Sequence, residues 1–508
     1  MEWNESFLIQ CQDNNLPHPL RFQIVSDEQE TLTEGELRNS QADLLRSFAR
    51  RSIGSLKGGK NPNAKGLLLL GNLKDIKASE PLFEIQDTAE GEGESARKYI
   101  DLIFHNIMGV FTLRDGKSCI RMQITSRFDK VDGPQPFLSW LLKKVCSINQ
   151  TQYLPADKGK FWNFLLELLF WAKLGDARKV GLYRQYMKHE YNNLQFKGHL
   201  DIDRHIRLNY PLKDKIAYSR REICYDNPLN HLLRYAVDIC DRDFGRSMAS
   251  PDAAAMATAI KAETPTWTRE GLKRLLLNKD IIHELRHPFY ADFYEDLRIL
   301  SLLLIDKLGV ELYANKDIPK NSRQINGVVF DGAWLWEAFL AKLLPGAWLH
   351  ANPETSLHPI YAMLDKNNKK KRELYPDFRL PQKAGEKQLS SVILDAKYKR
   401  GDASSGLAIR REDMYQCLGY MLLTGAAAGG VVYPPCLPED ARDNNADEEP
   451  DNHVNCPGAQ RVWHCHTFRY LGDVSLDKFN QKMLQEEQNF RKYVDNLTQK
   501  AESLLKYK

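Results

Sequence analysis

The stretch "VILDAKYKR", residues 392 to 400, constrains this chain most, because it sets an acid and a lysine into an otherwise apolar strand. Side chains alternate along a strand, so Asp395 and Lys397 are expected on the same face. Burying either group is costly unless it is paired or binds a metal ion. The stretch therefore predicts a half-buried strand that carries chemistry.

A second short strand, "LYPDFRL" at residues 374 to 380, carries Asp377. Side by side, the two strands are expected to bring Asp377, at the end of the first, close to Asp395. Two converging carboxylates are ligands for Mg²⁺, a hard cation that prefers oxygen. The metal ion would activate a water and neutralise charge on a phosphate, while Lys397 orients that water or stabilises the charged state. The pattern P-D-x(17)-D-A-K resembles the site of the PD-(D/E)xK nucleases.

An upstream apolar helix, "GAWLWEAFLAKLL" at residues 332 to 344, contains one acid, Glu337. Burial would raise the pKa of this acid unless it is paired or bound to a metal ion. We interpret Glu337 as a third catalytic carboxylate and metal ligand. The alternative is an acid paired with a Lys or Arg on the exposed side of the helix.

The segment "REDMYQCLGYMLL", residues 411 to 423, sets Asp413, Gln416 and Tyr420 on one face of a predicted helix. If this face lies against the sheet, Gln416 belongs to the catalytic set, and Asp413 and Tyr420 support it. If the helix is merely amphipathic, Gln416 faces solvent. Both interpretations stay open.

A basic run, "KNNKKKRE" at residues 366 to 373, precedes the strand with Asp377 and is expected at one edge of the catalytic cleft. Its cations are candidate DNA phosphate contacts, because ammonium groups act as point charges that do not read bases. The alternative is a solvated loop. The candidates are Lys366, Lys369, Lys370, Lys371 and Arg372.

Composition narrows the class of protein without identifying it. A chain of 508 residues with 43% hydrophobic and 27% charged residues indicates a soluble protein of two to three domains. A net charge of +4 does not by itself indicate nucleic-acid binding. No apolar run is long enough for a membrane helix, and "MEWNESFLIQCQDN" lacks a signal-peptide pattern, so we expect a cytoplasmic location and no membrane.

Two further patterns are weaker candidates for sites. The segment "GSLKGGKN", residues 54 to 61, resembles a P-loop but has Asn61 in the Ser/Thr position and follows a predicted helix. We therefore expect this chain to hydrolyse no nucleotide itself. A zinc site from Cys456 and the "HCH" of residues 464 to 466 lacks a C-x-x-C partner, and surface histidines on a strand are the preferred interpretation.

The fold class predicted from these patterns is α/β, with an α+β N-terminal region, a helical middle and a C-terminal nuclease-like core whose mixed sheet is flanked by helices. Two helices are expected between 160 and 190, followed by an extended polar arm over 196 to 227 that is short of apolar side chains. The closing helix, 475 to 507, is expected either to cover the sheet or to contact a partner. The predicted domains are an N-terminal mixed domain (1–155), helices plus arm (156–227), a helical middle (228–320), the nuclease domain (321–475) and a C-terminal helix (476–508).

An ordered series of motifs resembles the McrC family, the nuclease subunit of the McrBC modification-dependent (type IV) restriction system. Two of them depart slightly, with His231 in a usual Arg position and Trp336 in the position of a Phe or Tyr. The resemblance covers roughly residues 190 to 475. The matching segments are "FKGHLDIDRHIRLN", "YDNPLNHLLRYAV", "LWEAFLAKLL", "LYPDFRL", "VILDAKYK", "DMYQCLGYML" and "GGVVYP".

This resemblance implies a Mg²⁺-dependent DNA endonuclease subunit of a restriction and antiviral defence complex. Its implied partners are a McrB-like AAA+ GTPase oligomer, which binds the GTP, and modified double-stranded DNA. The arm is the expected docking element for the GTPase. Two other functions remain open, namely a non-catalytic adaptor that docks a nuclease fold on an AAA+ ring, and a stand-alone nuclease that acts on RNA.

Overall fold

The computed structural model divides the chain into two compact units, one of residues 1–162 with 320–508 and one of residues 163–319. The model describes residues 7–15, 18–29, 32–49, 51, 66–70, 81–91, 96–115, 118–129, 135–146, 158–211, 214–243, 245–276, 278, 281, 285, 288–306, 323–351, 358–364, 370–384, 388–399, 410–435, 453–456, 461–468 and 476–506.

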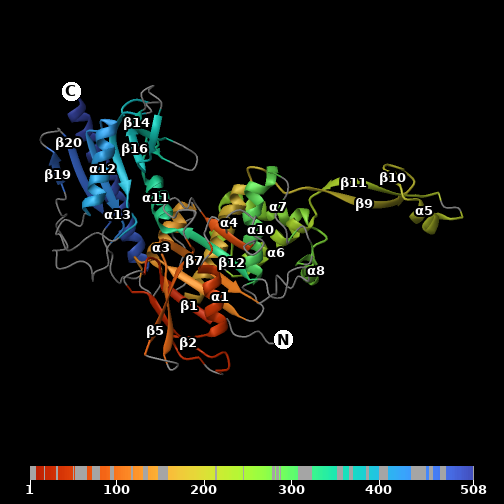
Figure 1. Cartoon of the computed structure of the whole chain (residues 1–508). Coiled ribbons are helices and arrows are strands. Elements are labelled where there is room, and N and C mark those ends of the chain that lie inside the picture. The colour runs from red at the N-terminus through yellow and green to blue at the C-terminus, as the bar shows by residue number, and fades with distance from the viewer. Residues whose placement is uncertain are drawn as a thin grey trace. The chain divides into compact units, whose positions relative to one another are not determined.

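The N-terminal part of the first unit is built on two sheets, as its mixed character predicted (Figure 1). The first sheet has the order β1-β8-β7-β12-β4. Its β7–β8 pair is the hairpin that "GVFTLRDGKSCIRMQITSRF" predicts with a turn about Asp115-Gly116. The strand β12 comes from far along the chain, yet it pairs with β7 over eight residues. The strands are β1 (Phe7–Gln12), β4 (Gly66–Leu70), β7 (Ile107–Arg114), β8 (Cys119–Thr125) and β12 (Gln324–Asp331).

The second sheet has the order β3-β2-β6-β5 and shares an apolar core with the first. The helix α1 (Asn39–Ala49) contributes Leu44, Leu45 and Phe48 to that core. The pattern of "ELRNSQADLLRSFARRSIG", residues 36 to 54, predicts a helix from its first residue, but residues 36 to 38 pair with β2 as a strand instead. The strands are β2 (Leu20–Val25), β3 (Glu36–Arg38), β5 (Glu84–Glu90) and β6 (Arg97–Ile103).

The C-terminal part of the first unit is a six-stranded mixed sheet of order β13-β16-β17-β18-β20-β19. The predicted strand pair is present, because β16 and β17 run antiparallel with Phe378 opposite Leu394. From β17 to β18 to β20 the strands are parallel. The strands are β13 (Leu349–His350), β16 (Phe378–Pro381), β17 (Ser390–Ala396), β18 (Ala428–Tyr433), β19 (His453–Cys456) and β20 (Arg461–Thr467).

Two glycines in β18 let helices approach both faces of this sheet. A Cβ on Gly429 would lie 2.4 Å from Met421 Sδ of α12 (Arg411–Thr424), and one on Gly430 would lie 2.1 Å from Tyr493 Oη of α13 (Leu476–Lys506). The flanked mixed sheet is therefore as predicted. Of the two expectations for the closing helix, the structure shows that α13 covers the sheet.

Two more elements of the first unit bear on the site. The helix α11 (Gly332–Leu343) follows β12 directly and is capped by Asp331, whose side chain accepts the Ala333 N–H. The helix α3 (Pro136–Val145) contacts α11 and α13. A separate strand pair, β14 (Ile360–Leu364) with β15 (Lys370–Leu374), stands apart from the six-stranded sheet.

The second unit is helical, as expected for the middle of the chain, and carries a protruding arm (Figure 1). Two helices were predicted between 160 and 190, but the structure has one there, α4, which ends at Ala177. The strand β9 begins at Gln185 in place of a second helix, and it pairs with β11 along its whole length. The helices are α4 (Lys158–Ala177), α6 (Pro228–Asp243), α7 (Pro251–Glu263), α8 (Leu272–Leu276) and α10 (Pro288–Asp306).

The arm consists of β9 (Gln185–Asn193), β10 (His199–Leu200) and β11 (Ile216–Cys224), with the short helix α5 (Ile202–Asn209) at its far end. The extended prediction for 196 to 227 was therefore wrong at α5. The local cause is the Asp201 carboxylate, which accepts the Arg204 N–H and caps the helix. Among the described residues, no helix is both long and apolar enough to cross a membrane.

Candidate functional site

The pairing of β16 with β17 brings Asp377 and Asp395 together. The segment 374 to 380 was predicted to be one strand that ends at Asp377, but β15 ends at Leu374 and Asp377 immediately precedes β16. One carboxylate oxygen of Asp377 accepts the backbone N–H of Ala396 at 2.7 Å, which holds this acid against the end of β17. Asp395 lies within β17 and is 1% exposed.

Lys397 completes the cluster. Its Nζ lies 2.7 Å from Oδ2 of Asp395, the contact expected for side chains two residues apart on one face. Burial opposes the charge of Lys397, but the neighbouring carboxylates Asp395 and Asp377 raise its pKa above the ordinary value. The two carboxylates therefore favour the charged form of this lysine.

Both acids are held where their negative charge is disfavoured. The pKa of Asp377 is raised well above its ordinary value by burial, and further by the charges of Glu337 and Asp395. Burial also raises the pKa of Asp395, although Lys397 acts in the opposite direction. One lysine does not balance three acids, so the cluster favours either a proton or an added cation.

Glu337 faces this cluster rather than the exposed side of its helix. It is 4% exposed on α11, and its charge is among the causes that raise the pKa of Asp377. Its Oε2 lies 3.3 Å from Nε2 of His350, a residue of β13 that the sequence analysis did not identify. The alternative of an acid on the exposed side is thus wrong. No local pattern marks His350, because it reaches the site through the pairing of β13 with β16.

The three predicted residues of α12 have different surroundings. Asp413 is buried and accepts hydrogen bonds from Lys399 Nζ at 2.6 Å and Tyr433 Oη at 2.7 Å, and neither partner was predicted. Gln416 is exposed and donates to Tyr420 Oη at 2.9 Å.

Tyr420 is half-buried near the acids. Burial raises its pKa, and the charges of Asp395 and Asp377 raise it further. The three residues therefore do not share one buried face, because Asp413 is buried, Tyr420 is half-buried and Gln416 is exposed.

The donor set suits a hard divalent cation. All of its candidate ligand atoms are carboxylate oxygens. Asp395 and Glu337 are buried and Asp377 is half-buried, and a cation that prefers oxygen would relieve the repulsion between these acids. Within the described parts of the chain, no three His, Cys, Asp or Glu side chains already form a metal-ligand group. The residues that could bind a divalent cation are Asp377 and Asp395, with Glu337 close by.

The remaining predicted residues lie elsewhere or outside the described residues. Lys366, Lys369 and the P-loop-like segment fall outside them, as do the side chains of Lys370 and Lys371 in β15, while Arg372 is exposed. Phosphate contact by this run stays a prediction. His464 and His466 are half-buried, and the ring of His466 stacks on Tyr493 at 4.8 Å, so the expectation of surface histidines was wrong because α13 covers them.

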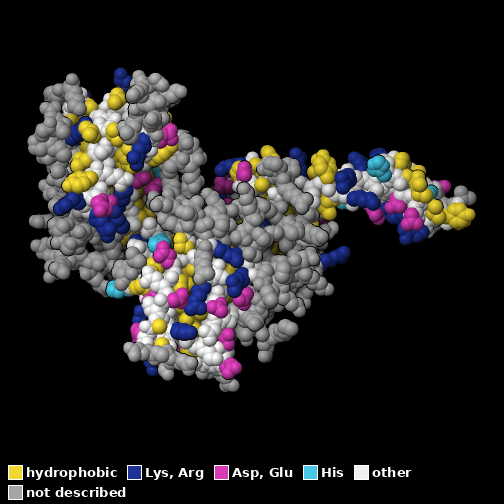
Figure 2. Space-filling model, in the orientation of Figure 1, with side chains coloured by type: hydrophobic (Ala, Val, Ile, Leu, Met, Phe, Trp, Pro, Cys, Tyr) yellow, Lys and Arg dark blue, Asp and Glu magenta, His cyan; other side chains and the backbone are white. Residues whose placement is uncertain are grey.

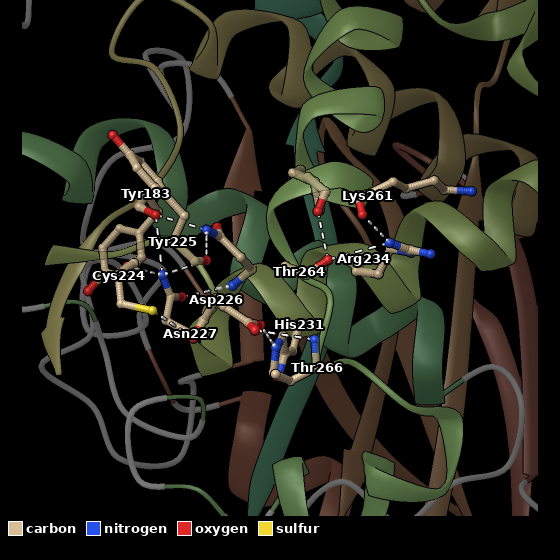
Figure 3. Close-up of polar contacts among 12 residues, drawn as sticks. Tyr183, Cys224, Tyr225, Asp226, Asn227, His231, Arg234, Lys261, Thr264 and Thr266 are labelled. Carbon is tan, nitrogen blue, oxygen red and sulfur yellow. Dashed lines mark hydrogen bonds and ion pairs between the residues drawn. The ribbon is translucent and has the colours of Figure 1, made fainter. Parts of the chain in front are cut away.

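The motif "YDNPLNHLL" builds the root of the arm in the second unit (Figure 3). The side-chain amides of Asn227 and Asn230 both donate to the backbone carbonyls of Tyr183, just before β9, and Tyr225, just after β11. His231 forms an ion pair with Asp226. Although burial opposes it, hydrogen bonds from His231 and Thr266 lower the pKa of Asp226. These bonds fix both strands of the arm to the start of α6.

The far part of the arm exposes apolar side chains, contrary to the prediction that it lacks them (Figure 2). Fixed charges there are largely paired within the arm, as in the Arg204–Glu190 and Arg207–Asp203 ion pairs. Exposed apolar clusters of this kind mark interaction surfaces. The exposed side chains are Leu194 (70%), Phe196, Leu200, Ile202 (64%), Ile206 (55%), Leu208 and Tyr210 (77%).

Comparison with known proteins gives a family match and distant structural matches. A family model described as "McrBC 5-methylcytosine restriction system component" matches residues 102–434. A half-complex from a tetradecameric assembly of Thermococcus gammatolerans McrB AAA+ hexamers with bound McrC is 13% identical, covers 95% of this chain and 100% of that chain, and has a TM-score of 0.39. The Thermococcus gammatolerans McrBC complex is 13% identical, with 67% and 87% coverage and a TM-score of 0.29. No curated protein matches the sequence.

Proposed function

This chain belongs to the McrBC 5-methylcytosine restriction system component family, and we propose that it is the subunit that cuts DNA in such a system. Its C-terminal sheet would then be a PD-(D/E)xK nuclease core, and its reaction the hydrolysis of phosphodiester bonds. The proposed substrate is double-stranded, modified DNA.

The cluster of Asp377, Asp395 and Lys397 is the observation that carries this proposal. Asp377 and Asp395, with Glu337 beside them, would hold Mg²⁺ through their oxygens. When bound, Mg²⁺ supplies an activated water and neutralises charge on the scissile phosphate. Lys397, held by Asp395 at 2.7 Å, presents a fixed cation to the reacting phosphate and stabilises its added negative charge.

Two substitutions test the catalytic assignment. We expect Asp395→Asn and Lys397→Ala each to lower DNA cleavage by a factor of about 100 or more, the usual effect of removing one electrostatic contributor. Lys383→Ala, which removes an exposed lysine just after β16, serves as the matched control and keeps near-normal cleavage. The measurement is nicking and cutting of modified duplex DNA with Mg²⁺ and the partner GTPase present.

Cleavage that survives in both variants would refute the nuclease assignment at this site. A wild-type chain that never cuts, yet stimulates the partner GTPase, would indicate the non-catalytic adaptor instead. Cutting of RNA without any partner would indicate the stand-alone nuclease.

The proposed partner is a McrB-like AAA+ GTPase oligomer that binds GTP, and the proposed docking element is the arm. Its exposed apolar side chains at Ile202, Ile206 and Tyr210 are costly in water and gain free energy when a partner covers them. The polar bonds at the root of the arm would hold these side chains at a fixed distance from the helices of the second unit (Figure 3).

A double variant tests this docking. Burial of an isoleucine contributes about 1.5–3 kcal/mol, so Ile202→Asp with Ile206→Asp should weaken partner binding at least about tenfold and remove GTPase stimulation. Ile223→Asp, on β11 nearer the root and 46% exposed, is the matched control and should retain stimulation. Equal stimulation by both variants would exclude the arm tip as the docking element.

A further inference from the structure

A cavity of about 610 Å³ lies in the first unit between β1 and the segment that follows β17. Residues 10–15 form one wall, and Tyr398, Lys399 and Arg410 form the other. The volume falls within the range of roughly 300–1,000 Å³ that is typical of small-molecule sites. The cavity therefore has room for a single small ligand or for one unit of a polymer.

The cavity wall is continuous in the chain with the strand that carries the candidate catalytic residues. Tyr398 and Lys399, which line the cavity, directly follow Lys397. Lys399 Nζ also lies 2.6 Å from Asp413, the buried acid of α12. The cavity is therefore built on the same segment as the candidate site.

The lining carries an excess of positive charge. Asp13, 1% exposed, is neutralised by Arg127, 5% exposed, at 2.7 Å. Lys399 is neutralised by Asp413 outside the lining. The exposed guanidinium of Arg410 has no ion-pair partner among the described residues. A guanidinium in this setting suits a phosphate group, which it binds through two parallel hydrogen bonds.

Side-chain amides give the cavity both hydrogen-bond acceptors and donors. Gln12 Nε2 donates to the Asp129 carbonyl at 2.5 Å, which leaves its Oε1 as an acceptor with no hydrogen bond to the described residues. Asn106 offers a donor instead, because its Oδ1 accepts a hydrogen bond from Arg127 and its Nδ2 remains available. Gln10 also lines the cavity, and its Nε2 donates to Gln123 Oε1 at 2.7 Å, so its Oε1 is a further acceptor. Acceptors and a donor in one lining complement the edge of a nucleobase.

The ring of Tyr398 gives the cavity a rigid aromatic wall. Its hydroxyl lies 3.1 Å from Ser126 Oγ, and the edge of Phe128 packs against it with centroids 5.0 Å apart. The Arg127 guanidinium lies 4.9 Å from the ring centroid. A ring held on these sides is pre-organised for contact with a flat ligand.

We propose that this cavity binds one nucleotide of the DNA strand that is cut, with its phosphate at Arg410 and its base against the amides of residues 10–15 and Asn106. The proposal rests on the proposed nuclease function. It assigns the N-terminal sheet to substrate binding, since most of the lining comes from there. The recognised chemistry is a nucleoside monophosphate unit, which DNA or a free nucleotide can supply.

Direct binding tests the proposal without catalysis. The full chain is titrated into a fluorescent single-stranded oligonucleotide in EDTA, and anisotropy gives the Kd. We expect Arg410→Ala, and separately Gln10→Ala, to weaken binding by about tenfold, the effect of one lost charge-assisted or bidentate contact. Arg411→Ala is the matched control, because Arg411 is the next residue, is also exposed and does not line the cavity.

A second arm distinguishes the two sources of ligand. An oligonucleotide with a 4-thiothymidine base should crosslink to lining residues such as His18 or Tyr398, and the Arg410→Ala variant should lose that crosslink. Free dCMP or dGMP should compete only at concentrations far above that of the oligonucleotide. Competition at equal concentration would overturn the DNA assignment in favour of a free nucleotide.

Identical affinities for Arg410→Ala, Gln10→Ala and Arg411→Ala would overturn the cavity as a nucleotide site. This outcome is separable from failure of the nuclease proposal, because Asp395→Asn reports on cleavage and not on binding. Retained cutting by Asp395→Asn with weakened binding by Arg410→Ala would refute the catalytic residues and leave the cavity assigned.

Discussion

At Asp377 the fold holds an acid where its neighbours oppose its charge. Burial, Glu337 and Asp395 all raise its pKa. A raised pKa in the folded state means that the acid contributes stability at low pH and loses it as the pH rises above the ordinary value of 3.8. Without a cation the site therefore destabilises the fold at neutral pH, which is a common property of functional sites.

Asp377→Asn should stabilise the metal-free chain at pH 7.5, by about 1 kcal/mol, because it removes the repelled charge and keeps an oxygen for the Ala396 N–H. Thermal unfolding in EDTA measures this as a higher midpoint than the wild type. Mg²⁺ at 100 times its Kd should stabilise the wild type by about 2.7 kcal/mol and the variant much less. A lower midpoint for the variant in EDTA would contradict this account of the site.

The helix α3 shows how one acid can define the start of an element. Asp129 is buried and accepts the backbone N–H groups of Phe137 and Leu138, both at 2.9 Å. Burial raises its pKa to about 7, although these two hydrogen bonds oppose the shift. Asp129 ends the short segment after β8 that also contains Ser126 and Arg127. The same segment therefore supports both the start of α3 and the wall of the cavity.

Because the pKa of Asp129 is raised from 3.8 to about 7 in the folded chain, stability should fall as the pH rises through that window. The fall is at most about 1.4 kcal/mol per pH unit. Asp129→Asn cannot titrate, so the slope of unfolding midpoint against pH between 4 and 7 should become flatter. Glu28→Gln, at an exposed acid, is the control and should leave the slope as in the wild type. An unchanged slope in the Asn variant would show that Asp129 does not titrate in this range.

For the whole molecule, the central fact is that residues 163–319 are inserted into a unit made from both ends of the chain. The strand β12 lies between β7 and β4 and pairs with both. It then leads directly into α11, which carries Glu337. The N-terminal sheet and the candidate site are therefore joined through one continuous segment.

A fragment of residues 1–162 should fail to fold, because without β12 the strands β7 and β4 present unpaired edges. We expect it to aggregate, and to become soluble when it is produced together with residues 320–508. Residues 163–319 form a separate unit and serve as the control, with an expected helical circular dichroism spectrum. A monomeric, folded fragment of residues 1–162 would contradict this dependence.

The sequence by itself determined those features whose causes are local. The strand pair around Asp377 and Asp395, the i+2 relation of Asp395 to Lys397 and the β7–β8 hairpin depend on alternation and turn residues within short spans. The helix α13 also follows from periodicity alone. Short-range geometry is largely fixed by the chain, which is why these features were predictable.

Only the tertiary structure decided which distant residues meet. No pattern indicates that His350 reaches Glu337, that β12 joins the N-terminal sheet or that Tyr398 packs against Ser126 and Phe128. In the arm, pairing with β11 made a strand of a predicted helix. Such outcomes depend on the free energy of burial and pairing across the whole fold, which local patterns do not encode.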